Sequence, residues 1–326
     1  MFAKYRLRNQ IFYTFKPLIP RRLQIYLRRQ SARRKRESYS HVWPIDPTTA
    51  KAPEGWPGWP DGKKFALLLC HDVDTQKGVD NCLKLAELET KLGFRSFFNF
   101  IPERYKNSNS LHLALRKGGF AIGVHGLKHD GKLFRSRMLF NQRAANINSY
   151  LIKWKTEGFT SPSMLRNSDW LKALNISYST STFDTDPFEP QPEASRTIFP
   201  FWIGDGHHSP GYLELPYTIP QDHLLFVILK EKNIDIWKKK LDWIAEKGGM
   251  ALLNTHADYI RFDGGKLGSE EYPISYYAEC LKFIKEKYNN QYWNVLPGEV
   301  VRFWKKTMTD REPKTRGDQI NSMYST

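Results

Sequence analysis

From residue 65 onward, short apolar runs alternate with segments of helical periodicity, and this alternation limits the fold more than any other feature of the chain. Residues 65–69 are all apolar, as expected for a strand that is covered on both faces. Residues 78–92 follow with apolar side chains at helical spacing and stop at Gly93. Repeated units of this kind predict a parallel sheet, so the expected fold class is α/β.

The same pattern continues almost to the end of the chain. It predicts further strands at 94–100, 120–124, 159–165, 177–182, 212–219, 250–254 and 293–296, and helices at 110–117, 133–156, 168–174, 234–246, 275–287 and 299–306. Residues 184–211 are rich in Pro, Gly and Asp, and they predict a long loop of the kind that is usually functional or mobile.

Four segments are expected along the chain. Residues 1–40 form a basic amphipathic arm, and residues 41–64 form a linker rich in Pro and Trp. The β/α core occupies residues 65–307, and residues 308–326 are a polar C-terminal tail. Of the net charge of +16, most lies in the arm, where twelve Lys or Arg residues accompany the single acid Glu37.

The basic arm interleaves its charges with aromatic and aliphatic side chains. This pattern is typical of a helix that lies in a membrane interface, here broken at Pro17 and Pro20. A solvated arm is the alternative. The arm has no uninterrupted apolar region of a signal peptide, and no stretch approaches the roughly 20 apolar residues of a membrane span. We therefore expect a cytoplasmic protein that contacts the inner face of an anionic membrane through residues 1–40.

Two other observations bear on location and partners. Cys70, Cys82 and Cys280 are odd in number and form no pair with metal-site spacing, which predicts reduced, buried thiols in a cytosolic protein. The core carries no nucleic-acid-binding motif, so a nucleic-acid partner is not expected.

Acidic and histidine side chains stand at the ends of three predicted strands. Asp72 and Asp74 follow the first strand and share a face if the chain stays extended. His125 and His129 are four apart, and both imidazoles would project from one side if the chain turned helically after residue 124. His256 follows the strand at 250–254, where it could act as a general acid.

Together these groups supply a metal site of two histidines and one carboxylate, with one carboxylate and one histidine to spare. That set is suited to metal-assisted hydrolysis of an amide or ester. Each group taken alone also has a structural interpretation: a strand-end turn, a surface helix pair or a hydrogen-bonded core histidine. Because functional residues of a closed β/α barrel come from the C-terminal ends of several strands, the arrangement favours a barrel over an open sheet.

The chain resembles the polysaccharide deacetylase family (carbohydrate esterase family four) over about residues 65–260. The first motif of that family carries a base aspartate and then a metal-binding aspartate, in some members separated by one residue, as Asp72 and Asp74 are here. The resemblance makes Asp72 the base and Asp74 a metal ligand. It also implies a distorted, incomplete (β/α)7-type barrel, to which the basic arm is an N-terminal extension.

Two further motifs of the family find counterparts. The second motif, a histidine pair, corresponds to His125 and His129, with Gly126 at the position where a hydroxyl residue is usual. The fifth motif ends in a histidine that acts as the acid, and it corresponds to His256. The resemblance therefore implies a divalent ion held by Asp74 and the histidine pair, with Zn the default for these ligand types.

The third motif departs from the family pattern. The family usually has an arginine that orients the base, two residues before a proline; here the proline is Pro162 and the arginine position holds Thr160. Arg166 is the candidate replacement, with an exposed salt bridge as the alternative. Arg166 and Pro162 are therefore the candidate orienting or substrate-binding residues. Asn254 occupies a position where an apolar residue commonly lines the acetyl pocket.

The implied activity is removal of an acetyl group from an N-acetylated sugar of a cell-surface polysaccharide or its lipid-linked precursor. Asp72 would take a proton from the attacking water, and His256 would protonate the departing amine. Two alternatives remain open. One is a hydrolase of another non-peptide C–N bond, and the other is a non-catalytic relative that binds glycans.

Overall fold

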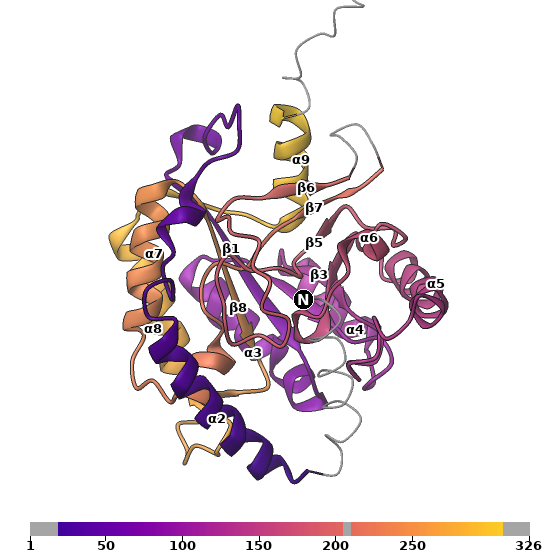
Figure 1. The fold of residues 1–326 in the computed structure, drawn as a ribbon, viewed down its shortest axis with the longest axis horizontal. Helices are drawn as coiled ribbons and strands as arrows, with labels where there is room; N and C mark the ends of the chain where they lie inside the picture. The colour runs from indigo at the N-terminus through magenta and orange to yellow at the C-terminus, as the bar shows by residue number, and fades with distance from the viewer. Residues whose placement is uncertain (1–18, 205–209, 309–326) are drawn as a thin grey trace, which may run out of the picture.

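The computed structural model describes residues 19–204 and 210–308 (Figure 1). Its strands are β1 (Phe65–Val73), β2 (Phe97–Phe100), β3 (Ala121–His125), β4 (Gly158–Thr160), β5 (Tyr178–Ser179), β6 (Phe201–Ile203), β7 (Tyr212–Glu214), β8 (Met250–His256), β9 (Ile260–Arg261), β10 (Tyr272–Pro273) and β11 (Tyr292–Asn294). Its α-helices are α2 (Arg21–Ser38), α3 (Gln76–Leu92), α4 (Asn109–Lys117), α5 (Arg137–Lys153), α6 (Ser168–Leu171), α7 (Asp235–Lys247), α8 (Ile274–Lys287) and α9 (Pro297–Met308). Shorter helical turns are η2 (Pro47–Ala50), η3 (Pro60–Gly62), η4 (Pro162–Met164) and the π-helical η5 (His223–Leu229).

The main sheet curls into an incomplete barrel. Within the described residues the hydrogen-bonded path runs in the order β11-β1-β2-β3-β4-β5-β7-β6. Strand β8 pairs with β1 along the edge opposite to β2 and β11. All pairs of this sheet are parallel except β6 with β7. Between β7 and β8 the barrel is joined only locally, by a parallel bridge of Ile219 with Leu253. The predicted α/β fold with an incomplete barrel is thus confirmed.

The side-chain alternation of β1 explains how a wholly apolar run precedes the polar site. Ala66, Leu68 and Cys70 belong to one core cluster, together with Met250 and Leu252 of β8. The intervening side chains of β1 pack into the other cluster, where the surrounding helices lie. Because successive side chains of a strand point to opposite faces, the next position on the Cys70 side of β1 is the first carboxylate. Polar groups therefore begin where the barrel core ends.

Helices cover the outside of this sheet. Figure 1 shows α7 and α8 together on one flank of the barrel, and α4, α5 and α6 on the opposite flank. Helix α5 begins later than predicted because the Ser136 side chain caps it, accepting a hydrogen bond from Leu139 N at 3.2 Å. Strand β1 continues to Val73, beyond the predicted end at residue 69, because its parallel ladder with β8 extends to Asp72 and its ladder with β2 extends to Val73.

The N-terminal segment packs on the barrel in the part that the structure describes. Helix α2 lies against η5, with Ile25 and Ala32 buried. The Arg29 guanidinium donates to Val227 O at 3.0 and 3.1 Å and to Ser269 O at 3.0 Å. The predicted break at Pro20 coincides with the start of α2, whereas the break at Pro17 lies outside the described residues.

Tryptophans of residues 41–64 and the three cysteines lie in the interior. Trp43 and Trp59 are buried, so residues 41–64 pack through their tryptophans. All three cysteines are free and buried. None of the helices in the described ranges is long and apolar enough to cross a bilayer.

Candidate active site

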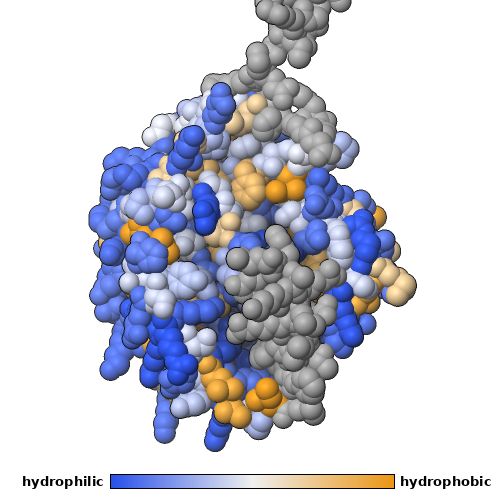
Figure 2. All heavy atoms as spheres, in the orientation of Figure 1, coloured by the Kyte–Doolittle hydropathy of each residue, from blue (hydrophilic) through white to orange (hydrophobic). Residues whose placement is uncertain are grey.

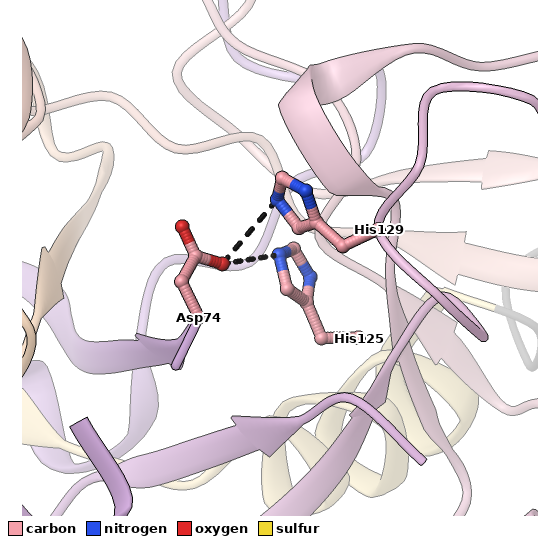
Figure 3. A group of neighbouring side chains, drawn as sticks. All are labelled: Asp74, His125 and His129. Atoms are coloured by element: carbon pink, nitrogen blue, oxygen red, sulfur yellow. Dashed lines mark ion pairs between the residues drawn. The ribbon is translucent and has the colours of Figure 1, made fainter. Parts of the chain in front are cut away.

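Three predicted metal ligands come together at the C-terminal ends of β1 and β3. Asp74, His125 and His129 offer ligand atoms that all lie within 4.8 Å of one another. Asp74 Oδ1 is 3.5 Å from His125 Nε2 and 3.3 Å from His129 Nε2 (Figure 3). Zinc bonds of about 2.0–2.2 Å in tetrahedral arrangement put neighbouring ligand atoms about 3.3 Å apart. The separations across the carboxylate therefore fit one small divalent ion.

Two further observations agree with a cation at this point. Asp74 Oδ1 is buried and has no hydrogen-bond partner among the described residues, a costly state for a carboxylate oxygen. His125 Nδ1 lies 3.2 Å from Thr160 O, and because a carbonyl only accepts, Nδ1 carries the proton. The Nε2 lone pair of His125 is thereby left free on the side of Asp74, as in histidines that bind metals.

His125 ends strand β3 and His129 lies on the loop that follows, so the predicted helical turn is wrong. Gly126 and His129 have positive φ angles of 61° and 52°, and no helix follows β3 directly. A Cβ atom at Gly126 would stand 2.5 Å from Pro162 Cγ. This contact, together with the left-handed backbone, accounts for glycine at a position where the family usually has a hydroxyl residue. It also shows that Pro162 packs under the histidine loop.

Asp72 is held by two carboxamides. The sequence analysis did not single out Asn99, and it placed Asn254 at the acetyl pocket without assigning it to Asp72. Asn99 Nδ2 donates to Asp72 Oδ1 at 2.9 Å, and Asn254 Nδ2 donates to Asp72 Oδ2 at 2.8 Å. Asn99 is the register partner of Asp72 on β2, and the lack of a side chain at Gly123 leaves room for it. A lone asparagine inside the aromatic strand β2 was the available signal. Asn254 thus contacts the predicted base directly.

His256 stands beside Asp72 and forms a pair with Asp222. It is the register partner of Asp72 on β8. Its Nδ1 lies 2.7 Å from Asp222 Oδ1, and its backbone N–H donates to Asp222 Oδ2 at 2.8 Å. Tyr272 also donates to Asp222, at 3.0 Å. No sequence motif marks Asp222, which lies 34 residues before the histidine that it holds.

Electrostatics favour charge states suited to binding a cation. Burial lowers the pKa of the His129 imidazole to about 4, which keeps it neutral near pH 7. Burial alone would raise the pKa of Asp74, but the facing imidazoles of His129 and His125 outweigh it and hold that pKa well below its usual range. Burial also lowers the pKa of His256, but Asp222, together with Asp74 and Asp72, more than offsets it and the result is about 10. His256 is therefore a protonated acid at neutral pH.

Asp258 holds the backbone of the loop that carries Asp74. Its carboxylate accepts a hydrogen bond from Asp74 N at 2.8 Å and another from the Thr75 hydroxyl. A Cβ atom at Gly78 would clash with this carboxylate at 2.4 Å, so the first turn of α3 approaches it closely. Asp258 thus fixes the loop between β1 and α3 that carries Asp74.

Arg166 is directed elsewhere. Its backbone N–H donates to Gln191 Oε1 at 2.9 Å, its guanidinium donates to the carbonyls of Met164 and Glu193, and it lies over the Phe183 ring. None of these contacts joins Arg166 to Asp72, which is oriented by Asn99 and Asn254, so they do not support the predicted orienting role of Arg166. Its substrate-binding role stays a prediction. Thr160, at the family's arginine position, bonds to Thr180 through its hydroxyl.

A cavity of about 620 Å³ lies at the opposite end of the barrel, near Ala121 and Tyr178 at the starts of β3 and β5. It includes none of the predicted site residues. In parallel α/β barrels the active site lies at the C-terminal ends of the strands, where Asp74 and His256 are found. We therefore place the candidate active site at that end.

Comparisons with known proteins give likenesses of fold. No family model and no curated relative matches the chain. A protein from Mycobacterium smegmatis assigned as a polysaccharide deacetylase aligns over 80% of this chain and 96% of its own, with a TM-score of 0.59 and 15% identity. The PuuE allantoinase aligns over 81% of this chain and 98% of its own, with a TM-score of 0.58 and 14% identity. The chain therefore has the fold of the polysaccharide deacetylases, as its motifs predicted.

Proposed function

We propose that the protein is a metal-dependent hydrolase that removes an acetyl group from an N-acetylated sugar. The substrate would be a cell-surface polysaccharide or its lipid-linked precursor. One observation carries the proposal: the carboxylate of Asp74 meets the imidazoles of His125 and His129, and Asp72 and His256 stand in register on the adjoining strands. The likeness of fold to the protein from Mycobacterium smegmatis supports the substrate class.

The proton transfers are assigned to two side chains. Asp72 accepts a proton from the attacking water, and the amide donors of Asn99 and Asn254 keep its carboxylate oriented. His256 donates a proton to the departing amine through Nε2, because its Nδ1 is engaged by Asp222. As the cleaved C–N bond leaves an amine, a histidine that stays protonated at neutral pH suits the step.

The residues that would hold the ion are Asp74, His125 and His129, and we propose zinc from the ligand types. A bound ion of this kind polarises the substrate carbonyl and lowers the pKa of water. Asp258 holds the Asp74 loop and Thr160 holds the His125 ring, so both ligands are oriented by their neighbours.

The test is acetate release from a panel of N-acetylated oligosaccharides by the full chain and by Asp72→Asn. We expect the variant to keep its metal and to lose about 10²–10⁴-fold in turnover, because the base is removed while the ligand set stays intact. Asp80→Asn, an exposed acid on α3, is the matched control. Wild-type turnover in Asp72→Asn would reject the proposal.

A second candidate is hydrolysis of a C–N bond outside sugars. It is favoured by the polar Asn254 beside Asp72, where the family commonly has an apolar residue, and by the likeness of fold to an allantoinase. Turnover of cyclic or linear non-sugar amides without acetate release from glycans would select this candidate. A protein that binds metal and glycan but hydrolyses neither class would be a non-catalytic relative.

We also propose that the enzyme works in the cytoplasm, at the inner face of a membrane, and we do not expect nucleic acid as a partner. The concentration of positive charge in residues 1–40 supports this location.

A further inference from the structure

Helix α2 turns an amphipathic surface away from the barrel. Leu23, Tyr26 and Leu27 are 46%, 57% and 52% exposed, and their spacing places them on one side of the helix. Exposed arginines flank this stripe. We call the following six residues the outer face of α2: Arg22, Leu23, Tyr26, Leu27, Arg33 and Arg34. Three large apolar side chains so close together on a surface helix call for a partner.

The opposite side of α2 is firmly attached to the barrel. Ile25 and Ala32 are buried, and the helix contacts η5. Ion pairs join Arg21 with Glu270 and Arg36 with Glu231 near its two ends. The helix is therefore part of the folded body, and its outer face has a fixed orientation relative to the active site.

That orientation places α2 beside the His256 side of the site. Glu270 and, to a smaller extent, the neighbouring Tyr259 raise the pKa of the Arg21 guanidinium, and the Tyr259 ring lies 5.3 Å from the His256 ring. In Figure 1, α2 runs along the lower edge of the molecule. Figure 2 shows strongly hydrophilic side chains there with hydrophobic ones among them.

We propose that the outer face of α2 docks on the surface of an anionic lipid bilayer. Interfacial helices combine an apolar stripe that enters the headgroup region with basic side chains that meet lipid phosphates. Helix α2 carries eight Lys or Arg residues against one Glu, so its charge is complementary to such a surface. An apolar stripe has no counterpart on a nucleic-acid backbone, which is why lipid is favoured over nucleic acid.

The consequence for the site is one of placement. With α2 on the headgroups, the rim formed by Tyr259 and His223 would lie beside the membrane, while the rest of the barrel stays outside the bilayer. Membrane docking does not require the proposed hydrolysis, so the two proposals are tested separately.

The first experiment measures cosedimentation of the full chain with phosphatidylserine-rich vesicles and with phosphatidylcholine vesicles. The test variant combines L23S, Y26S and L27S with R33E and R34E. The matched control places L113S, M138S, I152S, K117E and K282E on exposed positions of α4, α5 and α8. We expect salt-sensitive binding to the anionic vesicles alone, a loss of about tenfold or more in the test variant, and none in the control.

The second experiment reports which side of the protein touches lipid. Because the three native cysteines are buried, an environment-sensitive dye can be attached selectively to L27C or, as control, to M138C. We expect a blue shift on anionic vesicles for L27C only. This measurement also covers the case in which the multiple variant fails to fold, since each single change lies at an exposed position.

Four outcomes would overturn the proposal. The full chain could ignore anionic vesicles at low salt, or the test variant could bind them as the wild type does. A blue shift of L27C on addition of RNA or DNA, without one on vesicles, would reassign the surface to nucleic acid. Concentration-dependent dimerisation that the test variant abolishes, with no vesicle binding, would assign it to a second copy of the chain.

Discussion

Asp222 accepts a hydrogen bond from His256 at both its ring and its backbone, at 2.7 and 2.8 Å, across 34 residues of chain. The carboxylate thereby fixes the ring orientation and stabilises its protonated form. A histidine held in this way keeps its proton in a pH range where an isolated histidine has lost it.

We expect Asp222→Asn to move the alkaline limb of the kcat profile to lower pH. The pKa of His256 is raised to about 10, so the acid is protonated below that pH and is lost as pH rises through it. Without the Asp222 carboxylate the pKa of His256 should fall, because burial lowers it and the largest opposing charge is gone, so turnover at pH 8 should drop as the protonated fraction of the acid shrinks. The measurement is a pH series of kcat, with the exposed Asp169→Asn as control. An unchanged limb would remove His256 from the acid role.

His125→Ala should abolish stoichiometric metal binding. We expect elemental analysis after dialysis to find one ion per chain in the wild type. In the variant the metal content should be well below one ion per chain, because one of the three converging ligands is lost. Adding zinc at a hundredfold excess over its dissociation constant should stabilise the wild type by about 2.7 kcal/mol in thermal unfolding and leave the variant unchanged. The exposed His41→Ala is the control. Full occupancy in His125→Ala would refute the ligand assignment.

Asn254→Leu tests the carboxamide pair on Asp72. The change removes the donor to Asp72 Oδ2 and introduces an apolar side chain of the kind common in the family. Leaving that buried oxygen unpaired should cost about 1–3 kcal/mol of folding stability and lower turnover on acetylated sugars, while metal content stays at the wild-type level. Denaturant unfolding and kinetics decide this, with Asn233→Leu, an exposed position, as control. Faster acetate release by Asn254→Leu would show that Asn254 restricts the acyl group instead.

Lys240→Met should destabilise the protein strongly. Lys240 and Asp184 form a buried ion pair at 2.5 Å, and Lys240 also donates to Pro44 O at 2.6 Å. Removing the lysine leaves a buried carboxylate without its counter-charge, which costs about 3–5 kcal/mol. Burial already raises the pKa of Asp184 to about 6 against the pull of Lys240. A carboxyl with a raised folded pKa gains stability as pH falls, so the variant should recover in part near pH 5.

Urea unfolding at several pH values checks this last expectation. Lys239→Met, exposed and next in the helix, should change little. Equal stabilities of the two variants at pH 8 would contradict the buried-pair argument.

The strands that carry the ligands could be read from the sequence because their apolar runs are long and end in ionisable residues. Strands β1, β3 and β8 lie where they were predicted, within a few residues. The antiparallel strand β6 and the π-helical η5 were not predicted, since neither has a distinctive periodicity. Short segments of this kind depend on tertiary contacts more than on local preference.

The residues that hydrogen-bond to Asp72 and His256 could not be predicted from the sequence. Asn99 reaches Asp72 because β1 and β2 pair in one register, and a shift of one residue would turn Asn99 to the other face. Asp222 follows Pro220 and Gln221 without a motif, and only the closure of the barrel brings it to β8. The roles of Asp72, Asp74, His125, His129 and His256 stay predictions until variants are assayed.

The attachment of α2 to the barrel has a practical consequence for anyone who shortens this chain. A truncation after Ser40 would remove a highly charged segment. It would also remove α2 from the surface of η5 and leave Glu231 and Glu270 without the arginines that pair with them. The trimmed protein should be poorly soluble for reasons unrelated to its charge. A shortened protein that begins before Pro20 would keep α2 and its contacts with the barrel.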